Sequence, residues 1–274
     1  MTLLPRLQRG WTTAIGDRPG SFSISLYALD GSIAELNAGA HHYAASTIKV
    51  AVLAALLRAR ATGLLAWDDT SEVHARFTGV VGDRFDLAAE DDQDPATWAS
   101  LGSPVAWSVL AERMITVSSN IATDLIVERI GITAVQDFLV EADLAADLQF
   151  QRLIGDTAAQ RAGHTNTVTA DGLARLLVGL ATDRWLPTSD SSTAVEILSR
   201  QEYRDGIGAG LPSGTWLASK SGWVPGVRHD VALVRPPSAA PYALAICTTS
   251  PVPDAEAVAL IAELSRITYQ EWCA

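Results

Sequence analysis

Residues 44–57 read AASTIKVAVLAALL, and this stretch forms the centre of the fold that we predict. Its only charged residue is Lys49, and its apolar residues leave no polar face on a helix, so we expect a buried helix that other elements surround. Ser46 precedes the apolar run of this stretch, and serine is favoured at the start of a helix. With 274 residues and 48% apolar content, the chain is long enough to bury a substantial core around this helix.

Strand patterns lie on both sides of this centre, toward the two ends of the chain. Residues 21–37, SFSISLYALDGSIAELN, alternate apolar and polar positions around Asp30-Gly31, which is a strong signal for a hairpin. Both arms of that hairpin should be antiparallel strands. Three further strand-like runs occur later, at residues 215–223, 228–236 and 241–250.

Helical patterns fill the region between the two groups of strands, from about residue 42 to residue 204. One more helix is predicted over residues 254–272, DAEAVALIAELSRITYQEW, which begin with a capping Asp. We therefore predict an α+β fold, in which a five-stranded antiparallel sheet from both chain ends has flanking helices and an all-helical inserted lobe. We expect one domain over residues 1–274, with an α/β lobe of about 1–40 and 205–274 and a helical lobe of about 41–204.

Composition narrows the possible partners. The chain has 20 basic and 31 acidic residues, a net charge of −11, with no basic run, so nucleic acid is not an expected partner. The longest apolar run, residues 50–57, is far below the roughly 20 residues of a membrane span. No signal peptide is evident, which predicts a cytoplasmic protein unless a leader was trimmed. Cys247 and Cys273 have no metal-ligand spacing, so no metal or cofactor is expected, and the oligomeric state is not indicated.

Lysine is rare in this chain, and its two positions are therefore informative. Lys49 and Lys220 stand beside eighteen arginines. A codon preference for Arg explains the eighteen, but it does not explain the two lysines that remain. A buried lysine can lose its proton and act as a base, whereas arginine stays charged. Both lysines are thus candidates for chemistry.

Three short motifs contain the candidate site residues. Ser46 and Lys49 are three positions apart, so a helix would place them on one face, with the lysine near a candidate nucleophile. Ser118 and Asn120 lie in a turn between two helical patterns, and Lys220-Ser221-Gly222 lies in a strand. Alone, each motif has a simple structural explanation: a capping serine beside a solvent-reaching lysine, a helix cap, and an edge-strand lysine. Their order and spacing together are far more specific.

With these motifs the chain resembles the class A serine β-lactamases and penicillin-binding proteins, whose signature is S-x-x-K, S-D-N and K-T-G. The likeness covers nearly the whole chain. Four stretches carry it: AASTIKVAVLAALL, MITVSSNIATDLI, TNTVTADGLARLL and IGAGLPSGTWLASKSG. The resemblance implies a β-lactamase/transpeptidase-like fold and catalysis through an acyl-enzyme.

The resemblance also implies a role for each motif residue. Ser46 would attack the carbonyl, Lys49 would take its proton, and Ser118 would relay a proton to the leaving nitrogen. The substrate is expected to be a small molecule with a carboxylate. The remaining roles are binding ones: Asn120 would bind the side-chain amide, Lys220 and Ser221 the carboxylate, and the backbone N–H groups of Ser46 and Trp223 the oxyanion. Arg228 is either a second positive charge beside that carboxylate or an ordinary surface arginine.

The sequence departs from the family pattern at three places. Ser119 stands where the family usually has Asp, and Ser221 replaces Thr with the hydroxyl kept. No Glu occurs between Glu141 and Asn166, where class A enzymes carry the Ω-loop carboxylate that prepares the deacylating water. Asp156 is the nearest acid, and capping of its own turn is its expected role. We expect acylation to be fast and release of the acyl group to be slow.

Three functions remain in competition at this point. The first is a class A β-lactamase-like serine hydrolase that acts on a cyclic or peptide-like amide, with β-lactams as the named substrates. The second is a peptidase or esterase that uses the same residues on a metabolite. The third is a sensor module that captures a β-lactam or a cell-wall fragment covalently. We further expect the acidic loop 86–94 to be a solvated surface and His229 to be structural.

Overall fold

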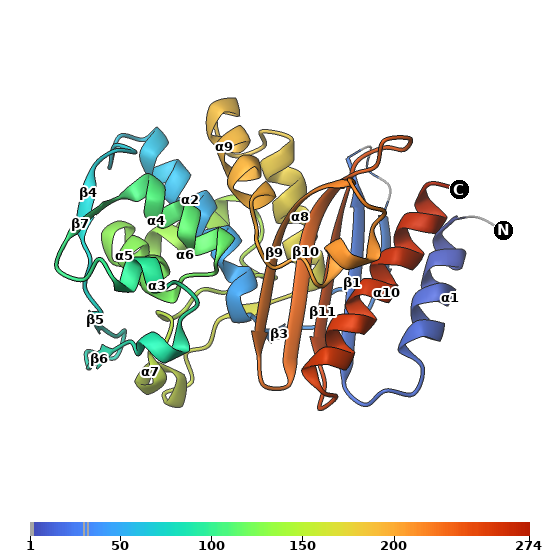
Figure 1. Ribbon diagram of the computed structural model, residues 1–274, viewed down its shortest axis with the longest axis horizontal. Coiled ribbons are helices and arrows are strands. Elements are labelled where there is room, and N and C mark those ends of the chain that lie inside the picture. The colour runs from blue at the N-terminus through green and yellow to red at the C-terminus, as the bar shows by residue number, and fades with distance from the viewer. Residues whose placement is uncertain (1–2, 30, 32) are drawn as a thin grey trace.

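A five-stranded antiparallel sheet forms the middle layer of the computed structural model, which describes residues 3–29, 31 and 33–274 (Figure 1). The strand order is β2-β1-β11-β10-β9, so strands from both chain ends meet in one sheet, as predicted. The hairpin predicted at 21–37 is confirmed by the pairing of Ile24 with Leu36, although its turn residue Asp30 lies outside the described residues. The strands are β1 (Ser21–Ala28), β2 (Ile33–Leu36), β9 (Trp216–Val224), β10 (Val227–Arg235) and β11 (Tyr242–Thr249).

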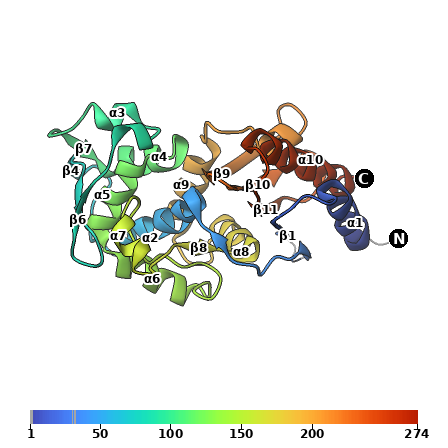
Figure 2. The ribbon, with the colours of Figure 1, turned by 90° about the horizontal axis from the view of Figure 1, so that it is seen from below.

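Helices cover both faces of this sheet. The terminal helices α1 (Leu3–Ile15) and α10 (Asp254–Trp272) pack side by side on one face, at the end of the molecule away from the helical lobe (Figures 1 and 2). Helix α8 (Ala170–Ala181) packs against β1 and β11. Successive strand residues point to opposite faces, so Val231 belongs to the core on the helical side and Ala232 to the core under α1 and α10.

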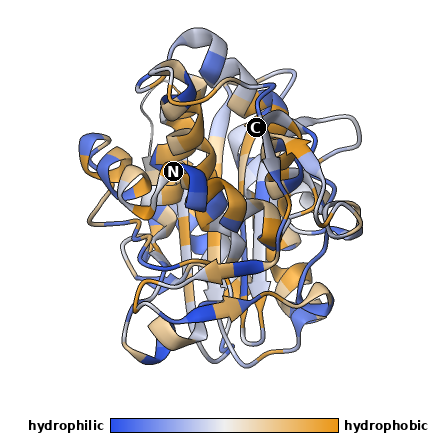
Figure 3. Cartoon of the chain, turned by 90° about the vertical axis from the view of Figure 1, so that its left-hand side faces the viewer, coloured by the Kyte–Doolittle hydropathy of each residue, from blue (hydrophilic) through white to orange (hydrophobic). Residues whose placement is uncertain are grey.

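The helical lobe is built around α2 (Lys49–Ala61), which follows the 3-10 turn η1 (Ala45–Ile48). Ten of the 13 residues of α2 are buried, which confirms the helix predicted without a polar face. Figure 3 views the molecule from the side of the helical lobe and shows hydrophobic residues along its helices. The other helical elements are η2 (Ala89–Asp91), α3 (Pro95–Trp98), α4 (Trp107–Thr116), α5 (Asn120–Ile130), α6 (Ile132–Glu141), α7 (Thr157–Arg161), α9 (Thr188–Ser199) and η3 (Ile207–Gly210).

Three small two-stranded ladders, which the sequence patterns did not predict, connect these elements. They are β3 (His42–Tyr43) with β8 (Thr167–Val168), β4 (Thr70–Glu72) with β7 (Pro104–Ala106), and β5 (Arg76–Thr78) with β6 (Arg84–Asp86). Within the described part of the chain, no helix has the length and apolar character needed to cross a membrane.

Two buried histidines join β3 to the sheet. The rings of His42 and His229 are 5.4 Å apart, edge to face. The Nε2 of His229 lies 2.9 Å from the carbonyl oxygen of Tyr43, and its Nδ1 accepts from the backbone N–H of Thr248 at 3.0 Å. The ring therefore carries its proton on Nε2, and a second proton on Nδ1 would break the bond from Thr248. His229 is thus structural, as predicted.

We expect this histidine pair to make the fold acid-sensitive. Burial lowers the pKa of both His42 and His229 from 6.5 to about 4. Between those two values the unfolded chain binds protons that the folded chain does not, so the free energy of unfolding is unaffected above pH 6.5 and falls as the pH drops toward 4. The expected loss between pH 6.5 and pH 4 is about 3 kcal/mol for each histidine and about 6 kcal/mol for the pair. Urea unfolding at pH 7 and pH 4.5 measures this loss. In a double variant, His42→Gln with His229→Asn, the free energy of unfolding should depend less on pH. The same pH dependence in the double variant would contradict the assignment.

Candidate active site

The nucleophile candidate Ser46 lies in η1, directly before α2 and beneath the edge strand β9. Ala45 before it has a φ of 45°, a left-handed conformation that is strained for a residue with a Cβ. Ser46 is half-buried and lines a cavity of about 260 Å³ between the helical lobe and β9. Its hydroxyl makes no hydrogen bond within the described part of the chain, so it does not act as a helix cap and is free to meet a ligand. The cavity is lined by Tyr43, Ala45, Ser46, Asp91, Gln93, Ser118, Asn120, Ile154, Trp223 and Val224.

Lys49 is completely buried behind this cavity. Its Nζ donates to the carbonyl oxygen of Ser118 at 2.6 Å and to Oδ1 of Asn120 at 2.8 Å, and lies 3.4 Å from Oγ of Ser118. No hydrogen bond joins it to Ser46, which differs from the contact expected from their spacing. Burial lowers the pKa of the Lys49 ammonium to about 8, and the carboxyls of Asp92 and Asp124 oppose this shift. A substantial fraction of Lys49 is therefore neutral near physiological pH, as a base must be.

Ser118 and Asn120 are held by the start of α5. The φ of Ser118 is 61°, and this left-handed turn is what directs its carbonyl toward Lys49. Ser119 caps α5 through the N–H of Ala122. The carboxylate of Asp92 accepts from the N–H groups of Asn120 and Ile121 at 2.9 and 2.8 Å. Asp92 thus fixes the turn together with Ser119, a role for Asp92 that the sequence did not predict.

The acidic loop 86–94 is only partly the solvated surface that the sequence predicts. That prediction is wrong for Asp94, which is 2% exposed and caps α3 through the N–H of Thr97, and for Asp92, which also accepts from Nε1 of Trp98. Asp86 fits the prediction, since it forms an exposed ion pair with Arg76. The Asp94-Pro95 pair is a local signal that could have predicted this cap, because proline is favoured at the first position of a helix and aspartate directly before it.

Lys220 approaches Ser118 from β9, on the opposite side from Lys49. Its Nζ donates to Oγ of Ser118 at 3.0 Å and to the carbonyl oxygen of Ser221 at 2.7 Å. It is completely buried, and its pKa lies well below the ordinary value, first because of burial and second because of repulsion from Lys49. The Ser118 hydroxyl therefore lies between the only two lysines of the chain. The hydroxyl of Ser221 is also buried and has no hydrogen-bond partner in the described residues.

Gly222 allows β9 to approach the nucleophile closely. A Cβ at this position would lie 2.7 Å from the backbone N of Ser46 and 2.9 Å from that of Thr47. The N–H of Ser46 and the peptide that joins Gly222 to Trp223 are therefore near neighbours. Two backbone N–H groups that point to one position can bind an oxyanion there, and this close approach is compatible with such a site.

We expect Gly222→Ala to reduce acylation of Ser46 by about 30-fold, because the new methyl group must push β9 away from the Ser46 amide and so disturb one oxyanion donor. Gly39→Ala is the matched control, since a Cβ there meets nothing within 4 Å. The rate of adduct formation by intact-mass measurement, with thermal unfolding recorded alongside, tests the prediction. Equal rates in the two variants would show that the close approach is irrelevant to the chemistry.

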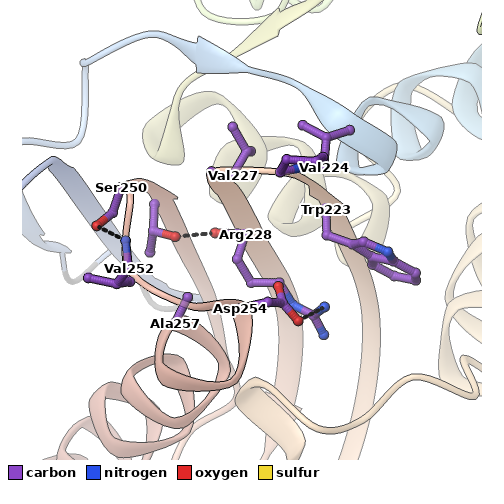
Figure 4. Close-up of a pocket in the computed structure, with 11 residues that line it drawn as sticks. Trp223, Val224, Val227, Arg228, Ser250, Val252, Asp254 and Ala257 are labelled. Atoms are coloured by element: carbon purple, nitrogen blue, oxygen red, sulfur yellow. Dashed lines mark hydrogen bonds and ion pairs between the residues drawn. The ribbon is translucent and has the colours of Figure 1, made fainter.

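Arg228 lies beside the cavity, behind Trp223, in a second pocket of about 290 Å³ (Figure 4). It pairs across the sheet with Trp223, and its guanidinium is stacked 4.9 Å from that ring. Two carboxylates, Asp205 at 2.8 Å and Asp254 at 3.4 Å, form ion pairs with it. Because of these ion pairs, the charge of Arg228 is already balanced. Its side chain is 7% exposed and does not line the Ser46 cavity.

Ile154 contributes an apolar side chain to the wall of the cavity. Its N–H donates to Oδ1 of Asp124 at 2.9 Å, which ties residues 150–156 to α5. Burial raises the pKa of Asp124 well above its ordinary value, although Lys49 and Arg152 oppose this. Asp156 caps α7 through the N–H of Ala159, as predicted. Among the lining residues only Asp91 is acidic, and no group of three or more His, Cys, Asp or Glu in the described chain could hold a metal ion.

The fold and this arrangement of a cavity serine with two buried lysines are those of a serine hydrolase. Comparison with known proteins agrees: the family model described as the beta-lactamase enzyme family matches residues 7–272. This chain therefore belongs to that family. It is 25% identical to Beta-lactamase 3 of Bacillus cereus over 254 residues, which is 90% of this chain and 76% of that protein.

Solved structures with the same fold cover nearly the whole chain. A β-lactamase from Xanthomonas campestris pv. campestris superposes with a TM-score of 0.85 at 20% identity, covering 98% of each chain. The structure of PBP-A superposes with a TM-score of 0.82 at 24% identity, covering 97% of this chain and 96% of that one. A PBP-A mutant at 23% identity, described as an acyl-enzyme complex with penicillin G, has a TM-score of 0.81 and covers 97% and 95%. These likenesses confirm the predicted α+β fold.

Proposed function

We propose that this protein is a serine hydrolase that forms an acyl-enzyme at Ser46 with a β-lactam or a related amide and releases the acyl group slowly. The observation that carries the proposal is the Ser118 hydroxyl between two buried lysines, beside the cavity that Ser46 lines. Membership of the beta-lactamase family and the penicillin complex of the PBP-A mutant support the choice of substrate.

In the acylation step, neutral Lys49 accepts the proton of Ser46 as Oγ attacks the amide carbonyl. The Lys49 ammonium has no carboxylate partner within 4 Å in the described residues, so its proton is available to the Ser118 hydroxyl. Ser118 passes a proton to the leaving nitrogen as the carbon–nitrogen bond breaks. The negative charge that develops on the carbonyl oxygen is stabilised by the N–H groups of Ser46 and Trp223.

The carboxylate of the substrate binds at the β9 side of the cavity. Lys220 has no carboxylate partner of its own in the described residues, and the Ser221 hydroxyl is unpartnered. The carboxylate of a bound substrate would give Lys220 a negatively charged partner. It would also accept a hydrogen bond from the Ser221 hydroxyl. Arg228 is a weaker candidate for this role because Asp205 and Asp254 already pair with it.

Slow release follows from the composition of the cavity wall. Hydrolysis of the acyl-enzyme needs a water molecule activated by a base near the ester. Ile154 supplies an apolar surface to the cavity wall, and Asp124 is buried and engaged by the Ile154 N–H. The acid of the lining, Asp91, is exposed and is assigned to substrate binding below. A long-lived adduct of this kind also favours a second candidate function, covalent capture of the ligand as a sensor.

Incubation with a chromogenic cephalosporin, followed by intact-mass measurement, tests the proposal. Catalytic colour release supports a β-lactamase, and a persistent mass adduct that disappears in Ser46→Ala supports slow turnover or capture. Absence of both would overturn the proposal and leave a peptidase or esterase that uses the same residues on a metabolite.

The rate of acylation should also report the protonation state of Lys49. Because only neutral Lys49 accepts a proton, acylation is expected to rise about tenfold per pH unit below pH 8 and to level off above it. Stopped-flow measurement of adduct formation between pH 6 and pH 9.5 gives this profile. A rate that is constant from pH 6 to pH 9 would remove Lys49 as the base.

A further inference from the structure

The two ends of the Ser46 cavity differ in the ionisable groups that lie there. At the β9 end, Lys49 and Lys220 are buried around Ser118 without a carboxylate partner among the described residues. At the other end, Asp91 lines the exposed mouth of the cavity. Neither Arg nor Lys occurs among the ten residues that line the cavity, so no cation in the lining itself offsets Asp91.

Asp91 is held in place by its backbone while its side chain stays unengaged. Its carbonyl oxygen accepts from Nδ2 of Asn120 at 2.9 Å. Its carboxylate forms no hydrogen bond or ion pair in the described part of the chain. The neighbouring acids Asp92 and Asp94 are different, because they cap α5 and α3. Asp91 is therefore the one acid of this loop that is both fixed at the cavity and available to a ligand.

Asn120 connects the two ends. Its Oδ1 accepts from Nζ of Lys49 at 2.8 Å and its Nδ2 donates to Asp91 at 2.9 Å. The lysine end is thus separated from the Asp91 backbone by one amide side chain, and one small ligand in this cavity of about 260 Å³ lies near both residues. One Nδ2 hydrogen of Asn120 remains for an amide of the substrate.

We propose that the preferred substrate is a zwitterion, in which the carboxylate binds at Lys220 and a protonated amine on the acyl side chain lies at Asp91. The inference rests on the proposed acylation of Ser46 and specifies its substrate class. The Asp91 carboxylate attracts an ammonium group at the mouth of the cavity and repels a second carboxylate there. Because Asp91 is exposed, each of these effects is about two- to fivefold in rate.

Three penicillins with the same benzyl side chain test the proposal: benzylpenicillin, its α-amino derivative ampicillin and its α-carboxy derivative carbenicillin. The second-order rate of adduct formation is measured for each at pH 7. We expect ampicillin to react faster than benzylpenicillin and carbenicillin to react more slowly. In Asp91→Asn the ratio of the ampicillin rate to the carbenicillin rate should fall about fivefold or more, and in Asp91→Lys the order should invert.

The matched control is Asp17→Asn, which changes the net charge by the same amount at an exposed position directly after α1 and outside the lining of the Ser46 cavity. Its ratio should equal that of the unaltered protein. An equal shift in both variants, or a ratio that Asp91→Lys leaves unchanged, overturns the zwitterion proposal. Failure of the proposed function is a different result, in which benzylpenicillin itself gives no adduct at Ser46.

Discussion

Lys49→Arg is expected to slow acylation of Ser46 by about 10³- to 10⁴-fold, the contribution of a positioned general base. Arginine retains the positive charge but does not give up its proton at any pH that the protein tolerates. The loss would therefore separate proton transfer from charge stabilisation. The measurement is the rate of the mass adduct with benzylpenicillin at pH 8.

A second variant guards against a folding defect, because Lys49 is completely buried and arginine is larger. Lys49→Met has similar length and no charge, and it too should lose acylation while it unfolds at a temperature close to that of the unaltered protein. Adduct formation at the normal rate in either variant would exclude Lys49 from the mechanism. A folded and inactive Lys49→Met would confirm that the amine, and not the space it fills, is required.

Ile154→Glu is expected to increase the rate of release from the acyl-enzyme by about 10²- to 10³-fold. The substitution places a carboxylate in the wall of the Ser46 cavity, where the structure has an apolar side chain. The backbone of that residue is already fixed by its bond to Asp124, so the new side chain starts from a defined position. The decay of the mass adduct after removal of free penicillin, together with steady-state turnover of a chromogenic cephalosporin, measures the gain.

Ile154→Gln is the control for this gain, because glutamine has nearly the same shape as glutamate and is polar, but its amide cannot act as a base. We expect Ile154→Gln to release its acyl group at nearly the original rate. If both variants accelerate release equally, entry of water explains the effect and no carboxylate is needed. If neither does, the barrier to release lies elsewhere in the cavity.

Much of the fold follows from local sequence patterns. Alternation in residues 21–37 and in the three late strands predicts the sheet, because each strand buries side chains on defined faces. The absence of a polar face on residues 44–57 predicts a buried helix. The short ladders such as β3 with β8 could not be predicted, since two-residue strands have no periodicity and depend on tertiary packing.

The site was predictable in its residue types but not in its contacts. The rarity of lysine identified Lys49 and Lys220, and the structure brings both to Ser118. Helical spacing suggested a direct contact between Lys49 and Ser46, but Nζ of Lys49 forms its hydrogen bonds with Ser118 and Asn120 instead, and these partners come from a distant part of the chain. The cap made by Asp92 depends on contacts across nearly thirty residues, and no local signal specifies such a contact.

The pairing of β1 with β11 has a consequence for biosynthesis. Ser21 lies opposite Thr249, so a segment made early must wait for one that leaves the ribosome more than two hundred residues later. The helical region can collapse around α2 in the meantime, while the β1–β2 hairpin remains an open edge that invites aggregation. We therefore expect the sheet to be completed late in folding, only after β11 has been synthesised.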